Sequence, residues 1–193
     1  MNIKQLVHAT RSCRRFDQSQ AIADNTLRDL IDLARLGGSA KNLQPLKYLA
    51  VNTPAQNETI FSHLGWAGYL PEWPGPAEGE RPTAYIVCLL DTKIATEAAC
   101  DLGIASQNIL LGATELGLAG CRIASISGKL HQALNLADHL KILLVIAMGF
   151  PKEKVIIEDA GPDDDIRYWH SPNLRHHVPK RRLADIIIKG QEK

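Results

Sequence analysis

The chain has 193 residues, of which 45% are hydrophobic and 22% are charged, as is usual for a folded globular protein. Its 22 basic and 21 acidic residues leave a formal charge of +1, which excludes a broadly basic surface for nucleic acid and requires any anion site to be local. Four scattered cysteines without a C-x-x-C pair, and no apolar run long enough for a signal peptide or a membrane span, predict a single cytoplasmic domain over residues 1–193.

The first elements along the chain are two helices, a strand and a third helix. A short helix is expected over 2–9, and a longer one over 24–38, where apolar residues recur at helical spacing on one face. That face comprises Leu27, Leu30, Ile31 and Ala34. A strand is predicted at 46–52 and a helix at 54–64.

Residues 65–83 are expected to form a loop, because they contain four prolines and four glycines. This loop also carries Trp66, Tyr69 and Trp73, which are unusual in a solvated connector. The aromatic side chains either pin the loop to the body of the protein or line the mouth of a binding pocket.

The rest of the chain alternates strands and helices up to residue 150. Strands are predicted at 84–91, 121–126 and 141–150, and helices at 94–117 and 128–136. Residues 151–178 are polar and are expected to be irregular before a closing segment at 178–188. Helices mixed with about four strands, without strict β-α-β alternation, predict an α+β domain.

Positive charge gathers in the sequence R-S-C-R-R-F at residues 11–16. The guanidinium groups of this segment and the hydroxyl of Ser12 are donors suited to a single phosphate group. A solvated basic turn, with Phe16 as a core plug, is the alternative interpretation. A second basic group, P-K-R-R at 179–182, either grips the same phosphate or forms a basic tail.

The stretch G-G-S-A-K-N-L-Q-P at 37–45 offers hydroxyl and amide groups that can bind a polar ring or a ribityl chain. A plain helix-to-strand connector would contain similar residues. The sequence lacks the glycine-rich phosphate loops of nucleotide-binding folds and the signatures of α/β-hydrolases and zinc proteases. His176 and His177 have no further ligands at metal spacing, so no metal site is expected.

Together these segments resemble the FMN-dependent nitroreductase family over essentially the whole chain. The family's opening signature R-S-x-R-x-F fits residues 11–16. Its P-S-x-x-N-x-Q-P-W pattern fits four positions within 38–46 and departs at Gly38 and Leu46. The segment 101–121 is similar to the family's central helix, and the terminal H-H-V-P-K-R-R-L is similar to its last phosphate-binding segment.

The resemblance implies a nitroreductase-like fold, with a mostly antiparallel sheet of four to five strands surrounded by helices in an intertwined homodimer. It also implies two FMN sites at the subunit interface. Phosphate contacts are implied for Arg11, Ser12 and Arg14, completed by Lys180 and by Arg181 or Arg182. Further contacts are implied for Ser39, Ala40 and Asn42 of the other subunit and for the backbone of Ala124 and Ser125 at the flavin ring.

The expected cofactor-binding set also includes Cys13, Arg15 and Gln44, which belong to the same two motifs. Cys13 beside arginines could have a lowered pKa, but a buried packing role is favoured. Family members often have additional flavin contacts in the region occupied here by residues 65–83, and no equivalent is evident in this loop.

The resemblance implies an NAD(P)H-dependent FMN oxidoreductase that passes hydride through the flavin to an electron-poor acceptor such as a nitroaromatic or a quinone. Because the flavin carries the redox chemistry, we expect no catalytic nucleophile or acid–base pair in the chain. One alternative is a flavin- or nucleotide-binding sensor without nicotinamide turnover. Another is a cofactor-free module that binds a peptide through residues 65–83.

Overall fold

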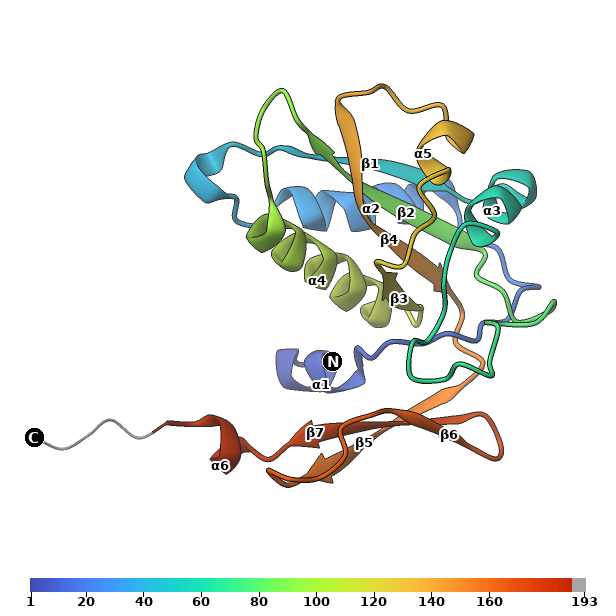
Figure 1. Ribbon diagram of the computed structural model, residues 1–193, viewed down its shortest axis with the longest axis vertical. Coiled ribbons are helices and arrows are strands. Elements are labelled where there is room, and N and C mark those ends of the chain that lie inside the picture. Colours follow the sequence, from blue (N-terminus) through green and yellow to red (C-terminus); the bar gives the residue numbers. More distant parts are fainter. Residues whose placement is uncertain (189–193) are drawn as a thin grey trace, which may run out of the picture.

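A computed structural model describes residues 1–188, and Figure 1 shows a larger sheet flanked by helices above a smaller C-terminal sheet. The helices are α1 (Ile3–Ala9), α2 (Asp24–Arg35), α3 (Pro54–Phe61), α4 (Ala99–Glu115), α5 (Leu130–Ala133) and α6 (Leu183–Ile186), with a 3-10 turn η1 at Ala40–Asn42. The strands are β1 (Leu46–Val51), β2 (Ala84–Asp91), β3 (Ala119–Ile123), β4 (Leu140–Gly149), β5 (Lys154–Ala160), β6 (Trp169–Ser171) and β7 (Arg175–Arg181). In the described part of the chain, no helix combines the length and apolar character needed to cross a bilayer.

The larger sheet has the strand order β1-β2-β4-β3, and all its pairings are antiparallel. Successive side chains of β2 serve two separate apolar clusters, because neighbouring residues of a strand point to opposite faces. Ile86 packs with residues of α2 and α4, whereas Tyr85 and Val87 pack with residues of α3 and α5. The α+β fold with an antiparallel sheet surrounded by helices is therefore confirmed.

Helices α2 and α4 lie together on one face of this sheet (Figure 1). The apolar face expected for α2 is confirmed, since Leu27, Leu30 and Ala34 are buried and Ile31 is partly buried against the same cluster. A Cβ atom built at Gly112 would lie 2.3 Å from Leu33 Cδ1. Glycine at this position therefore allows α2 and α4 to approach closely.

The C-terminal region contradicts the irregular structure expected for residues 151–178. This region forms β5, β6 and the start of β7, in the order β5-β7-β6 with β5 parallel to β7. Two of these strands give little signal in the sequence, because β6 has only three residues and β7 is mostly polar and contains Pro179. The proline is tolerated because β6 pairs only with residues 175–177 of β7.

Candidate functional site

The basic segment at residues 11–16 runs between the two sheets, from α1 toward α2 (Figure 1). Its backbone is bonded on both sides: Cys13 N donates to Gly120 O at 3.1 Å, and Arg15 O accepts from Lys152 N at 2.9 Å. Phe16 is 0% exposed and fills the core, as the alternative interpretation of this segment proposed for its side chain. The segment is therefore held as a fixed strip of backbone rather than as a solvated turn.

A cavity of about 260 Å³ opens beside this strip, between α4, β3 and the C-terminal sheet. Its lining includes the basic side chains Arg11, Arg14, Arg122 and Lys180. Ser12 and Gln107 add neutral polar groups, and no carboxylate among the described residues lines it. We refer to it as the basic cavity. Its donor set suits an anion with several oxygen atoms.

Arg11 is fixed by its own helix. Its Nε donates to Thr10 O at 2.6 Å and its Nη2 donates to Val7 O at 2.9 Å. Thr10 in turn donates through Oγ1 to Thr114 Oγ1 at the end of α4, at 2.9 Å. Partial burial lowers the pKa of the Arg11 guanidinium, which nevertheless stays charged as arginines do in proteins.

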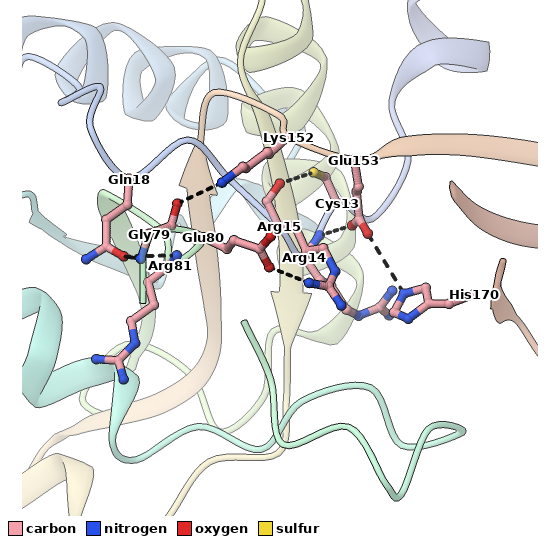
Figure 2. Close-up of polar contacts among 10 residues, drawn as sticks. All are labelled: Cys13, Arg14, Arg15, Gln18, Gly79, Glu80, Arg81, Lys152, Glu153 and His170. Atoms are coloured by element: carbon pink, nitrogen blue, oxygen red, sulfur yellow. Dashed lines mark hydrogen bonds and ion pairs between the residues drawn. The ribbon is translucent and has the colours of Figure 1, made fainter. Parts of the chain in front are cut away.

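Arg14 is held by the C-terminal sheet. Its backbone N–H donates to the carboxylate of Glu153, as Figure 2 shows. Its Nη1 lies 3.0 Å from His176 Nε2, and its guanidinium carbon lies 4.7 Å above the centre of the Tyr168 ring. The guanidinium of Arg14 therefore lies in the basic cavity next to His176 of β7.

Cys13 and Arg15 are in the same segment but do not line the basic cavity. Arg15 forms an ion pair with Glu80 (Figure 2). Its guanidinium also lies over the ring of Trp73. Cys13 is buried and contacts Arg15 O through Sγ at 3.2 Å. Burial raises the pKa of its thiol, which supports the packing role and not an activated thiolate.

The second motif lies at the other end of α4. Ser39 Oγ donates to Asp101 Oδ2 at 2.5 Å, and Ala40 N donates to Asp101 Oδ1 at 3.1 Å. Gln44 N donates back to Ser39 Oγ at 2.9 Å, while the amide of Gln44 donates to Asn42 Oδ1 at 3.2 Å. Ser39 and Gln44 line a separate cavity of about 270 Å³.

The two motifs are therefore apart within one chain. Asp101 and Thr114, their anchors on α4, are roughly 20 Å apart at about 1.5 Å per residue of helix. A single ligand group cannot contact both motifs of one chain across that span.

Of the remaining residues expected to bind the cofactor, one lines the basic cavity and the others lie outside it. Lys180 lines the basic cavity, whereas Arg181 donates to Pro162 O at 2.8 Å and Arg182 Nε lies 3.5 Å from Asp185. Ala124 and Ser125 are exposed at the end of β3 and do not line the basic cavity. Lys180 is thus the residue of P-K-R-R whose position suits the anion.

Arg122 lines the cavity and was not among the residues expected from the sequence. Its Nε donates to Ser106 Oγ and its Nη2 donates to Gln107 Oε1, each at 2.8 Å. Both acceptors lie on α4. A signal was present in the sequence, because Arg122 is a charged residue within an otherwise apolar strand.

A cluster that the sequence analysis missed lies next to Arg14 and comprises Glu153, His170 and His176. Ligand-type atoms of Glu153, His170 and His176 lie within 4.8 Å of one another, although His176 was expected to have no additional partners for a metal. Glu153 Oε2, His170 Nε2 and His176 Nδ1 are buried and have no hydrogen-bond partner among the described residues. Sequence spacing does not reveal this cluster, because it depends on the pairing of β6 with β7.

The loop expected at 65–83 is confirmed, since these residues contain no helix or strand. Its three aromatic side chains all contact other rings. Ring centres are 5.7 Å apart for Trp66 and Phe61, 5.0 Å for Tyr69 and Tyr168, and 5.3 Å for Trp73 and His170. These contacts favour the interpretation that the aromatic residues pin the loop.

Comparison with known proteins agrees with this architecture. A curated protein of Methanothermobacter thermautotrophicus, with the provisional name NADH dehydrogenase/NAD(P)H nitroreductase, is 27% identical over 177 residues, covering 86% of each chain. A crystal structure from Desulfovibrio desulfuricans, described provisionally as a nitroreductase in complex with FMN, has a TM-score of 0.70 at 20% identity and covers 100% of this chain and 99% of its own. A nitroreductase family protein from Streptococcus pneumoniae has a TM-score of 0.71 at 17% identity, covering 98% of this chain and 100% of its own.

The structural likenesses confirm the fold, and a match to the sequence model of one family shows to which family the chain belongs. The model of the nitroreductase family matches residues 7–72 and 81–150, which is more than half of the chain. The matched part contains both polar motifs, the larger sheet and α4. The chain belongs to the nitroreductase family.

Proposed function

We propose that this protein is an FMN-dependent oxidoreductase that takes hydride from NAD(P)H and passes it to an electron-poor acceptor such as a nitroaromatic or a quinone. The observation that supports this most strongly is the basic cavity, where Arg11, Arg14, Arg122 and Lys180 converge beside Ser12. A ligand with a phosphate group would offset these charges.

The cavity suits the phosphate end of FMN and not the whole cofactor. Its volume of about 260 Å³ is below the roughly 300–1,000 Å³ usual for sites that enclose a whole ligand of drug size. Arg11, Ser12, Arg14 and Lys180 would hold the phosphate. Ser39, Asn42 and Gln44 of a second subunit would supply the polar groups for the ring and the ribityl chain.

The chain's own contribution is position and electrostatics. Flavin, when bound, supplies the hydride-accepting chemistry, so the protein needs no nucleophile of its own. The fixed backbone of residues 11–16 orients the arginines before a ligand arrives, which reduces the ordering cost of binding.

A homodimer is part of the proposal. Ile186, Ile187 and Ile188 are 60%, 59% and 95% exposed, which is unusual for three consecutive isoleucines. Strand β1 is also an edge of the larger sheet. Exposed apolar residues of this kind mark an association surface.

The test is a visible spectrum of the purified protein, reconstituted with FMN, followed by anaerobic addition of NADH or NADPH. We expect the flavin absorbance to bleach with at least one nicotinamide and to return when a quinone or a nitroaromatic is added. Bound flavin that neither nicotinamide bleaches would support the sensor alternative instead. Failure to bind FMN at all would refute the proposal.

A further inference from the structure

The contacts of His176 suggest a function that the family comparison does not supply. His176 lies in β7, in the part of the chain after residue 150, beyond the region that the nitroreductase model matches. It is 1% exposed and lines the basic cavity. A buried imidazole needs a hydrogen-bond partner, and the partner of its Nε2 is the guanidinium of Arg14 at 3.0 Å.

This contact fixes which ring nitrogen carries the proton. A guanidinium only donates hydrogen bonds, so His176 Nε2 must accept and its single proton must sit on Nδ1. Burial, together with the nearby positive charge of Arg14, lowers the pKa of His176 to about 3. The imidazole is therefore neutral near pH 7 and remains a hydrogen-bond acceptor.

Arg14 is restrained by three residues that lie in the C-terminal sheet or directly before its strands. Its backbone N–H is bonded to Glu153, its guanidinium lies on the Tyr168 ring, and one of its terminal nitrogens is bonded to His176. A guanidinium has five N–H donors, so one bond to His176 leaves four for a ligand. A restraint of this kind selects one rotamer of a side chain that otherwise loses much entropy on binding.

We infer that His176 is a positioning residue, which aims the Arg14 guanidinium at the phosphate of the cofactor through its unprotonated Nε2. The inference rests on the proposed FMN function. It assigns to the C-terminal sheet the role of tuning phosphate recognition, while the flavin ring is bound elsewhere.

The neighbouring carboxylate and imidazole do not make this cluster a better metal site. Glu153, His170 and His176 are chemically suitable ligands within 4.8 Å of one another. However, Nε2 of His176 is occupied by the hydrogen bond from Arg14, and Nδ1 carries the ring proton while that bond is kept, so neither nitrogen is free to bind a cation. A cation there would also lie near the positive charges of Arg15 and Arg14, which add to the effect of burial in lowering the pKa of His170.

The experiment compares FMN with riboflavin, which has the same ring and ribityl chain but no phosphate. Affinities are measured by fluorescence quenching for apoprotein of the parent and of each variant. His176→Gln keeps a polar atom near the position of Nε2, whereas His176→Asn places its amide near Nδ1 and loses the contact with Arg14. Both variants keep a polar side chain of similar size, so their folding can be matched by thermal melting.

We expect His176→Asn to weaken FMN binding about ten-fold, which corresponds to one lost charge-assisted bond, and to leave riboflavin affinity unchanged. His176→Gln should retain most of the FMN affinity. His177→Gln is the matched control, because His177 bonds to Glu158 and Ser171 and not to Arg14. Its ratio of FMN to riboflavin affinity should equal that of the parent.

A double-mutant cycle then tests whether His176 acts through Arg14. In an Arg14→Ala background, His176→Asn should cause no further loss of FMN affinity. An additive loss, or an equal loss of FMN and riboflavin, would overturn the inference. If Arg14→Ala alone leaves the FMN-to-riboflavin ratio unchanged, the proposed phosphate site is wrong, which is a different failure. Micromolar Zn²⁺ binding by the parent that is lost in both His170→Ala and His176→Asn would show that His176 is a metal ligand and would also refute the assignment.

Discussion

The side chain of Phe16 anchors the basic segment at residues 11–16, and its truncation is a direct test of the architecture. Phe16 is 0% exposed, and an ideal Cβ at Gly149 would lie only 2.8 Å from the Phe16 Cβ, so the ring fills its site completely. Truncation of a buried phenylalanine to alanine costs about 3–5 kcal/mol. In a chain of this length, 1 kcal/mol shifts Tm by roughly 2–4 °C, so Phe16→Ala should lower Tm by roughly 6–20 °C.

The assay is thermal unfolding by circular dichroism, with FMN affinity measured well below the new Tm. FMN binding should also weaken, because Phe16 anchors the backbone that carries Arg11 and Arg14. Gly149→Ala is the paired variant: it overpacks the same contact at a cost of about 1–3 kcal/mol, and the cost should shrink in a Phe16→Leu background. A fall in Tm of less than about 2 °C for Phe16→Ala would refute the packing argument.

Four other predictions follow from the structure. Replacing Arg11 or Arg14 by alanine should weaken FMN binding by about ten- to hundred-fold in a titration, since each removes charge-assisted bonds of roughly 1.5–3 kcal/mol; retained affinity would contradict the phosphate assignment. Burial raises the pKa of the Glu153 carboxyl above its usual 4.5, so the protonated carboxyl stabilises the fold below pH 4.5 and this stabilisation is lost as pH rises through the folded pKa. Glu153→Gln cannot ionise, so its gain in Tm over the parent should be larger at pH 7 than at pH 4; equal gains at the two pH values would disprove this account. Ile187→Asp should shift the protein from dimer to monomer in light scattering at low micromolar concentration, whereas an unchanged dimer would place the interface elsewhere. Trp73→Ala should lower Tm and spare both flavin half-reactions in stopped-flow measurements, because its ring packs on His170 and Arg15; rates that change with acceptor size would instead indicate a lid.

The sequence predicts the larger sheet and its helices well, because their signals are local. The apolar spacing of α2 and the continuous apolar run of β2 each report burial directly. Boundaries are less accurate: the helix expected over 94–117 spans Ala99–Glu115. Tertiary contacts, and not residue propensities, decide where such an element ends.

The C-terminal sheet was not predictable in the same way. Its strands β6 and β7 are short or polar and are stabilised by pairing between residues distant in the sequence. The missed groups also depend on contacts between distant residues. His176 lies in β7, and Glu153 is brought to Arg14 by the pairing of residues 151–152 with residues 15–16. Arg122 is different, because its charge in an apolar strand was visible but did not belong to either motif.

The arginines of this nearly neutral chain differ in whether a carboxylate balances their charge. Arg15, Arg35 and Arg81 each have a carboxylate within ion-pair distance, and their charges are balanced within the protein. Arg11 and Arg14 are half-buried, and no described carboxylate lies within that distance of either guanidinium. Uncompensated charge next to a low-dielectric interior is unfavourable unless an anion joins it. Among the described residues, the arginines that are both half-buried and without an ion-pair partner are the two arginines of the R-S-x-R motif, so burial and charge pairing identify the same residues as the motif.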